Sequence, residues 1–228
     1  MTTPNEPNKY LAEAVKRGDL VAVESAIDAG ADIHDNQDFA LRMAAQKGFL
    51  SIVKRLVRCD ADIHAKEDTA LRWSAFNGHT DVVRFLIESG ADLHAKGNYA
   101  LQWASYNNHI RTVAELIRQG VDVSARQSYA LRVASHNGSP DLIALLLDHG
   151  SDIHARNEYP LQGAAIHGQA DTVDLLLSRG AKPEKAIAEL TALRENKAII
   201  FIRERQMHAQ MKNHENADSH ETTGIHPA

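Results

Sequence analysis

The sequence predicts an all-α fold, a solenoid of helix–turn–helix units stacked in a row. Three observations predict it. The first is a period of 30 residues that sets five glycines in step, at Gly30, Gly90, Gly120, Gly150 and Gly180. The second is a leucine column with the same step, at Leu41, Leu71, Leu101, Leu131 and Leu161. The third is that each unit contains two short apolar segments with helical spacing. A strict period of this length is typical of repeat proteins, in which each unit buries its apolar face only against its neighbours.

Each unit is expected to form a short first helix, a turn, a second helix and a loop. In the first helix, Leu41 and Ala44 lie on one face, and the small alanine permits close packing on the next unit. The turn follows at Gly48 and its equivalents. The second helix is well marked at Ser139-Pro140-Asp141, because Ser caps free amides, Pro fits the first helical position and Asp suits the positive end of the helix dipole. Gly150, which tolerates a left-handed backbone, then ends that helix.

The loop after the second helix carries a recurring phrase. It is Gly90-Ala91-Asp92-Leu93-His94-Ala95 in one unit and Gly150-Ser151-Asp152-Ile153-His154-Ala155 in another. This phrase resembles the glycine–alanine–aspartate phrase of the ankyrin repeat family. The resemblance extends from Tyr10 to about Met211 and implies a curved, elongated stack of ankyrin-type helix pairs. It also implies a non-catalytic scaffold that binds another protein through a concave groove.

Two features differ from the family's usual pattern. The unit has 30 residues, whereas ankyrin units usually have about 33. The missing residues fall between His64 and Leu71, where the family builds a projecting β-hairpin finger, and the family's Thr-Pro-Leu-His phrase has become Thr69-Ala70-Leu71-Arg72. We therefore expect short finger loops instead of hairpin strands. Units of this kind resemble the ankyrin arrays of giant amoebal DNA viruses and of some bacteria.

We predict a single ankyrin-repeat domain over residues 9–212, between flexible tails at 1–8 and 213–228 that hold too few apolar residues to offset the entropy lost on ordering. The predicted segments are an N-terminal cap at 9–38, repeats at 39–68, 69–98, 99–128, 129–158 and 159–185, and a C-terminal cap at 186–212. A cap needs a polar outer face. The residues expected to supply it are Glu195, Lys197, Arg203, Glu204, Arg205 and Lys212. Capped ends favour a monomer.

Composition indicates a soluble cytoplasmic protein, in the cytoplasm of a host cell if the chain is viral or a bacterial effector. The 228 residues are 43% hydrophobic and 24% charged, with a formal charge of -5, which argues against attraction of the whole protein to phosphate backbones. The single cysteine, Cys59, is expected to be an inert surface thiol. We find neither a charged start followed by an apolar run nor a stretch of membrane-spanning length, so no membrane contact is expected.

Neither an enzyme site nor a metal or cofactor site is predicted. His34, His64, His94 and His154 form a column, but stacked helices lie about 8 to 10 Å apart. Zinc ligands must all reach within about 2.0 to 2.3 Å of one ion. Each histidine is therefore expected to hydrogen-bond within its own loop. The aspartate column is assigned a structural role in the loops for the same reason, since catalysis requires a local exception to the repeat. It comprises Asp32, Asp62, Asp92, Asp122 and Asp152.

Partner-binding residues are expected where the repeats differ from one another. The arc of the first helix opposite its packed face lines the concave groove, as the resemblance implies. The candidate residues on this arc are Arg72, Trp73, Phe76, Asn77, Gln102, Trp103, Tyr106, Asn107, Arg132 and His136. Aromatic residues and arginine anchor many interfaces, so the groove centred on residues 69–128 is the predicted site. For Trp73 and Trp103 a second interpretation stays open, namely packing in the core between repeats.

A second function is kept as an alternative, the binding of an anion or a nucleic-acid backbone along a basic strip in the short fingers. The strip would consist of Lys66, Lys96, Arg126 and Arg156. The alternative without a binding function is that these residues form a solvated face whose charge nearby carboxylates partly neutralise. Arginine at a helix start is electrostatically unfavourable, so the arginines there are expected to have a partner. The preferred function remains capture of another protein, whose identity the sequence does not reveal.

Overall fold

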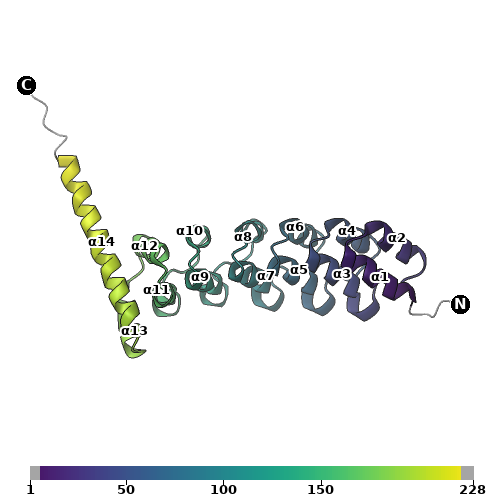
Figure 1. Ribbon diagram of the computed structural model, residues 1–228, viewed down its shortest axis with the longest axis horizontal. Coiled ribbons are helices and arrows are strands. Elements are labelled where there is room, and N and C mark those ends of the chain that lie inside the picture. The colour runs from purple at the N-terminus through teal and green to yellow at the C-terminus, as the bar shows by residue number, and fades with distance from the viewer. Residues whose placement is uncertain (1–5, 222–228) are drawn as a thin grey trace, which may run out of the picture. The chain divides into compact units, whose positions relative to one another are not determined.

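The computed structural model describes residues 6–221, with side chains up to Lys212. Helices and short connections account for this described part, and no strand occurs in it (Figure 1). The helices are α1 (Glu6–Arg17), α2 (Leu20–Asp28), α3 (Asp35–Lys47), α4 (Leu50–Arg58), α5 (Ala65–Phe76), α6 (Thr80–Glu88), α7 (Ala95–Tyr106), α8 (Ile110–Arg118), α9 (Ala125–Asn137), α10 (Pro140–Asp148), α11 (Ala155–Ile166), α12 (Ala170–Ser178), α13 (Pro183–Ala192) and α14 (Asn196–Glu221). The predicted all-α class and its pairing of short helices are confirmed.

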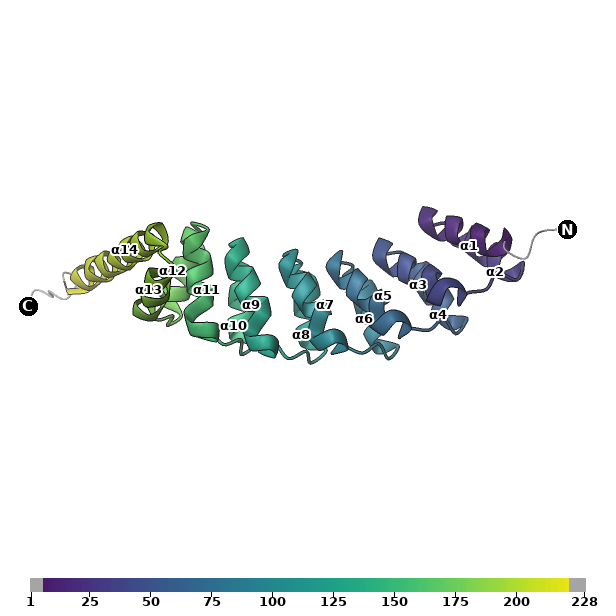
Figure 2. The ribbon, with the colours of Figure 1, turned by 90° about the horizontal axis from the view of Figure 1, so that it is seen from below.

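The contacts divide the chain into two compact units, one up to Arg126 and one from Gln127. In the first unit, α1, α3, α5 and α7 form one row, and α2, α4, α6 and α8 form a second row beside it (Figures 1 and 2). Each first helix packs on the second helix of its own repeat and on the first helices of neighbouring repeats. In the second unit, α11 packs on α12 and α13, and α14 packs on α11, α12 and α13. The single domain expected over residues 9–212 stays a prediction.

The core of each unit consists of the columns that repeat in the sequence. The leucine column is buried throughout, with Leu41, Leu131 and Leu161 fully inaccessible. Ala44, one turn from Leu41, is equally buried and lets neighbouring first helices approach closely. Burying a leucine side chain stabilises a fold by about 1.5–3 kcal/mol. Because every repeat contributes the same column, this stabilisation recurs along each unit.

The turn between the two helices of a repeat is covered by a side chain of the next repeat. Gly48 has φ +77°, and a Cβ added there would lie 2.5 Å from Nδ1 of His79. The other ring nitrogen of His79 donates to the carbonyl of Gln46 at 2.9 Å. A side chain at this position would displace the imidazole, so the turn needs glycine both for its left-handed backbone and for space.

The short fingers are single left-handed turns. In α5, Lys66, Glu67 and Asp68 have φ between 51° and 57°, values of the left-handed helical region. The same conformation recurs in α3, α7 and α11. The expected replacement of hairpin strands by short loops therefore holds in the described residues. Left-handed geometry costs about 1–2 kcal/mol per residue other than glycine, so each finger needs compensating contacts.

The C-terminal cap differs in part from its prediction. Helix α14 continues to Glu221, beyond the predicted end of the domain at residue 212. Lys197, Arg203, Glu204 and Lys212 are exposed as expected, but Arg205 turns inward and pairs with Asp174. Of the tails predicted at 1–8 and 213–228, residues 1–5 and 222–228 lie outside the described residues, and α1 already begins at Glu6.

Candidate interaction surface

Four aromatic side chains gather on two neighbouring first helices of the first unit. Trp73 and Phe76 come from α5, and Trp103 and Tyr106 come from α7. The ring of Phe76 stands edge-on to that of Trp103, with 5.4 Å between the ring centroids. Edge-to-face pairs are attractive beyond their buried area, so the two repeats hold each other's rings in place. We call these four residues the aromatic cluster.

Three members of the aromatic cluster are open to solvent. The exposed fractions are 36% for Trp73, 39% for Phe76 and 57% for Tyr106. Trp103 is half-buried, and its ring also stacks on that of Tyr99 at a centroid distance of 5.8 Å and lies 5.9 Å from the guanidinium of Arg72. Trp73 therefore lies on the surface rather than in the core between repeats, while Trp103 supports the exposed ring of Phe76.

The two asparagines predicted beside the aromatic cluster bind backbone carbonyls. Asn77 donates through Nδ2 to the carbonyl of Trp73 at 2.8 Å. Asn107 donates to the carbonyl of Phe76 at 3.0 Å and to that of Trp103 at 3.2 Å. Because Asn107 connects α7 to α5, it fixes the relative position of the rings on the two helices.

The sequence places Arg72 and Gln102 among the partner-binding residues. In the structure their side chains hydrogen-bond to backbone carbonyls of the fingers instead. Only 8% of Arg72 and 6% of Gln102 is exposed. Arg72 donates to the carbonyl of Glu67 at 2.9 Å and to that of Lys66 at 2.8 Å. Gln102 donates to the carbonyl of Gly97 at 2.6 Å. These two residues are removed from the candidate surface, because their polar groups already satisfy the carbonyls of the left-handed turns.

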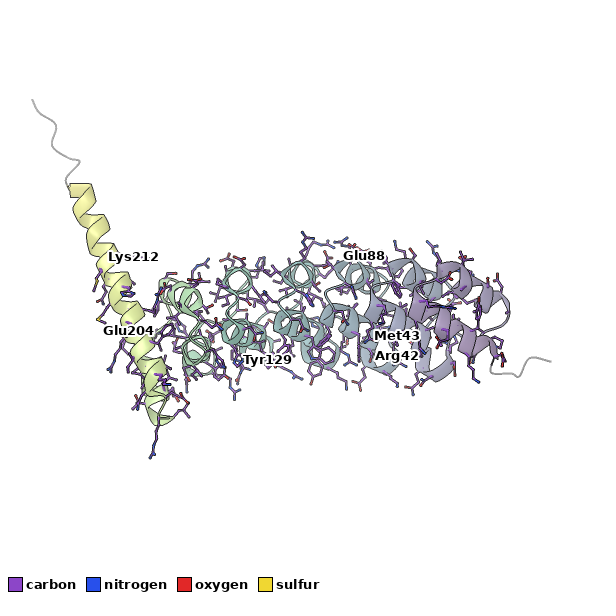
Figure 3. All side chains as sticks on the ribbon, in the orientation of Figure 1. Arg42, Met43, Glu88, Tyr129, Glu204 and Lys212 are labelled. Carbon is purple, nitrogen blue, oxygen red and sulfur yellow. The ribbon has the colours of Figure 1, made fainter. Side chains whose placement is uncertain are left out.

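Residues equivalent to Arg72 in other repeats also donate to the carbonyls of their own fingers. The partner expected for an arginine at a helix start is therefore the backbone of the finger. Arg42, marked in Figure 3 beside Met43 on α3, donates to the carbonyls of Asn36 and Gln37. In the second unit, Gln162 donates to the carbonyl of Asn157. Burial lowers the pKa of Arg72, although Asp68 opposes the shift. The guanidinium remains a cation at physiological pH.

The four residues of the predicted basic strip are exposed, and two of them, Lys96 and Arg126, have partners within the protein. In the first unit, Lys96 forms an ion pair with Glu67 at 2.7 Å. The guanidinium of Arg126 lies 4.9 Å from the ring centroid of Tyr99 and donates to the carbonyl of Lys96 at 2.9 Å. Lys66 of the first unit and Arg156 of the second are also exposed. These contacts favour the interpretation as a partly neutralised face over a row of free cations.

The second unit contains the two remaining candidates, Arg132 and His136. Arg132 is half-buried, with its guanidinium 5.2 Å from the ring centroid of Tyr129 and 5.5 Å from that of Tyr159. His136 is exposed, and its ring lies 3.8 Å from that of His167, centroid to centroid. Burial and the neighbouring His167 lower the pKa of His136. The imidazole therefore presents a neutral surface at neutral pH.

The loop histidines and aspartates have the structural roles that their periodicity predicts. The ring of His64 lies 3.0 Å from the carboxylate of Asp68 within the same finger, and His34, His94 and His154 make the equivalent contact. Asp62 accepts a hydrogen bond from the backbone N–H of His64 at 2.9 Å. The prediction that each histidine hydrogen-bonds in its own loop is confirmed.

Comparison with known proteins agrees with this architecture. A family model described as ankyrin repeats in three copies matches residues 11–97 and 101–187. The chain belongs to the ankyrin repeat family. A search of curated proteins finds no significant match to the chain.

Ankyrin repeats are generally protein-interaction modules and typically have no catalytic activity. Among the described helices, none combines the length and the apolar character needed to cross a bilayer.

Sequence reasoning missed an ionic cluster on the second helices of the ankyrin repeats. Glu115 of α8 is buried, with only 6% exposed. It accepts hydrogen bonds from Arg118, Arg84 of α6 and Gln119. The bond from Arg118, supported by those from Gln119 and Arg84, lowers the pKa of Glu115 to about 2 against the cost of burial. The column of Glu115 holds Phe85, Leu145 and Leu175 in three other repeats but also Arg55, so the column was only a partial signal.

This cluster borders an open depression between α6 and α8 with a volume of about 920 Å³. Its walls include the paired hydroxyls of Thr80 and Thr112, which lie 2.9 Å apart. The depression belongs to the second helices and is separate from the aromatic cluster on the first helices. Arg84 and Arg118 both form ion pairs with Glu115. The cluster therefore connects two repeats and does not present an unpaired charge at Glu115.

The distribution of acidic residues was a further missed signal. The segments that follow the fingers, at 39–47, 69–77, 99–107, 129–137 and 159–167, contain no aspartate or glutamate. The chain as a whole has 30 acidic residues against 25 lysines and arginines. Carboxylates are therefore absent from the part of each first helix that follows the finger and presents the aromatic cluster, although the fingers themselves contain acidic residues such as Glu67 and Asp68 and the protein is acidic overall.

Proposed function

We propose that this protein is a non-catalytic scaffold that binds a segment of another protein across the first helices α3, α5 and α7. The observation that carries the proposal is the aromatic cluster of Trp73, Phe76, Trp103 and Tyr106, of which three members are exposed. Exposed aromatic side chains held by their neighbours bury large area with few rotamers to freeze, which is the property of interface anchors.

The charge distribution supports a partner segment that combines apolar and acidic side chains. Beyond their fingers, residues 39–47, 69–77 and 99–107 of the first helices carry no carboxylates, and Lys47 on α3 and Lys66 in the finger of α5 are exposed cations. Apolar side chains of the partner would cover the aromatic cluster, while carboxylates would face these lysines. Complementary charge of this kind accelerates encounter and fixes register more than it adds affinity.

A nucleic-acid or other polyanionic backbone is the second candidate, because the same lack of carboxylates favours it. Two members of the basic strip, Lys96 and Arg126, already have partners within the protein. An anion would have to compete with Glu67 for Lys96. Protein capture is therefore the function that the contacts favour.

The test is selection of binding peptides from a random displayed library on the intact protein, followed by titration of the selected peptides. Peptides with acidic and apolar residues are expected to emerge. A double variant, Phe76→Ala with Tyr106→Ala, should weaken their binding by about tenfold or more, the loss of about 1.4 kcal/mol or more that one interface anchor causes. The thermal midpoint should stay near that of the wild type, since both side chains are exposed.

Ile166→Ala is the matched control, because Ile166 is 43% exposed on a first helix of the other unit. Undiminished peptide binding by the Phe76 and Tyr106 double variant would remove the proposal. Charge reversal at Lys96 and Arg126 separates the second candidate. It should abolish any shift of single- or double-stranded oligonucleotides in a gel while leaving peptide binding largely intact. A shift with steep salt dependence in the wild type would favour the nucleic-acid function.

A further inference from the structure

The terminal helix α14 has two contrasting faces. Ala198, Ile199 and Ile202 are buried against the second unit. On the opposite side, Ile200, Met207 and Met211 are exposed by 55%, 49% and 58%. At 100° per residue, spacings of seven and four residues bring these three side chains onto one line, centred opposite Ile202. We call Ile200, Met207 and Met211 the outer stripe.

The outer stripe departs from what a terminal cap requires. A capping element of a repeat array ends the stack with a polar surface, and the sequence of α14 supplies charges for one. These charges flank the outer stripe instead of covering it. The stripe extends over about 16 Å at the helical rise of about 1.5 Å per residue, long enough to seat three turns of another helix.

The charges beside the outer stripe are arranged symmetrically about Ile200. Lys197 lies three residues before Ile200 and Glu204 lies four residues after it, so both fall on the same side of the stripe. Both side chains are exposed, and Figure 3 marks Glu204 on this helix. Consider a second α14 that runs antiparallel to the first and is related to it by a two-fold axis beside Ile200. The side of the stripe that holds Lys197 and Glu204 then lies next to the same side of the second copy. Lys197 then faces Glu204 of the second copy, and the reverse contact is identical, as two-fold symmetry requires.

We propose that the outer stripe of α14 is the contact between two copies of this chain, paired antiparallel across Ile200. In this arrangement Ile200 meets its own equivalent, and Met207 reaches the first turn of the other α14, next to which Leu193 is 62% exposed. Two Lys197–Glu204 pairs flank the apolar contact. These two pairs are self-complementary, because each copy supplies one lysine and one glutamate to the same side of the contact. This complementarity favours a second copy, running antiparallel, as the occupant.

One helix face on each copy is small for a protein interface. Stable assemblies bury about 1,200–2,000 Å², so the pairing is expected to be reversible, with a dissociation constant in the micromolar range. It is independent of the aromatic cluster in the first unit, and it replaces the monomer expected from the capped ends.

The experiment is sedimentation velocity of the full chain over a range of protein concentrations spanning the micromolar range. The wild type should shift from monomer to dimer as concentration rises. Ile200→Glu and Met207→Glu should each raise the dissociation constant by about tenfold or more, because each places a charge in the apolar contact. Val21→Glu is the matched control, since Val21 is 72% exposed on α2 of the other unit and should leave the dimer unchanged.

Charge exchange tests the direction of pairing. Lys197→Glu and Glu204→Lys should each weaken the dimer, because each brings like charges together. The double variant restores both pairs and should recover wild-type association. Circular dichroism confirms that each variant is folded. A wild type that stays monomeric at every concentration, a dimer that persists in Ile200→Glu, or a double variant weaker than either single variant overturns the proposal.

Discussion

The carboxylate of Asp68 accepts a hydrogen bond from the backbone N–H of Asp92, 24 residues later, at 2.8 Å. Asp68 is the last residue of a left-handed finger, is 4% exposed and also contacts the ring of His64. The contact joins one repeat to the loop of the next. Equivalent contacts with the same 24-residue step connect Asp38 with Asp62, Ser128 with Asp152 and Glu158 with Lys182. Asn98 makes a different bond over the same step, because its side-chain amide donates to the backbone carbonyl of Asp122.

The first prediction concerns this contact between repeats. Asp68→Ala should lower the free energy of unfolding by about 1–3 kcal/mol, because it leaves the backbone N–H of Asp92 without its acceptor and removes the partner of His64. Urea denaturation measures the loss, and amide exchange should accelerate at Asp92. Asp68→Asn is the matched control and should cost less than about 1 kcal/mol, since the amide keeps a side-chain oxygen that can accept from the N–H of Asp92. Equal losses for the two variants would contradict the role of the acceptor oxygen.

The parts of the fold that were predicted from the sequence are those that repeat. The leucine column and the turn glycines recur at a fixed step, so a side chain such as Leu71 could be placed in the core from its period alone. The aromatic cluster was found in the same way, as a departure from the period on a helix face whose packed side was already known. The period shows which face of a helix packs against its neighbours, and the face on which a side chain lies largely determines its exposure.

The positions whose exposure differs from expectation depend on backbone conformation. Arg72 lies on the arc opposite the packed face, yet it is buried because it folds back onto the carbonyls of Lys66 and Glu67. The residue types of the segment Lys66-Glu67-Asp68 do not predict a left-handed turn. Gly97 and Asn98 in the next repeat tolerate that conformation and were a partial signal. The exposed stripe of α14 was hidden for a related reason, because the cap departs from the 30-residue period.

The second prediction concerns Arg72. Arg72→Ala should destabilise the protein by about 2–3 kcal/mol, because the charged donors to the carbonyls of Lys66 and Glu67 are lost. Arg72→Gln should recover part of the loss, as Gln102 makes one such bond in the next repeat. Arg72→Lys should remain close to Arg72→Ala, because an ammonium group lacks the planar fork that reaches two carbonyls. Thermal and urea unfolding measure the series. Full stability of Arg72→Ala would mean that the finger holds its shape without this side chain.

The third prediction is a pH dependence from Glu115. The pKa of Glu115 in the folded protein is about 2, below its ordinary value of 4.5. Because the folded pKa is the lower one, the stabilisation is fully present above about pH 4.5 and is lost as pH falls towards 2. Replacement by Gln should cost about 1–2 kcal/mol at neutral pH, less than the full shift implies, since Arg84 and Arg118 are partly exposed.

Urea unfolding of wild type and Glu115→Gln at several pH values tests this linkage. The difference in unfolding free energy should shrink steadily below pH 4.5 and approach zero near pH 2. Arg118→Gln should reduce the pH dependence of the wild type, because Arg118 makes the largest contribution to the lowered pKa. A difference between wild type and Glu115→Gln that is constant with pH would show that the ionised carboxylate does not stabilise the fold.

The fourth prediction separates two costs of replacing a left-handed glycine. Gly30 and Gly48 have φ of +85° and +77°, but a Cβ at Gly30 meets nothing within 4 Å, whereas one at Gly48 would collide with the ring of His79. Gly30→Ala should therefore cost only the left-handed strain, about 1–2 kcal/mol. Gly48→Ala should cost about 1–3 kcal/mol more, because the imidazole must move and give up its bond to the carbonyl of Gln46. Both residues lie in the first unit, so urea unfolding of the two variants compares like with like. Equal losses would mean that His79 moves aside without cost and that the ring does not hold the turn.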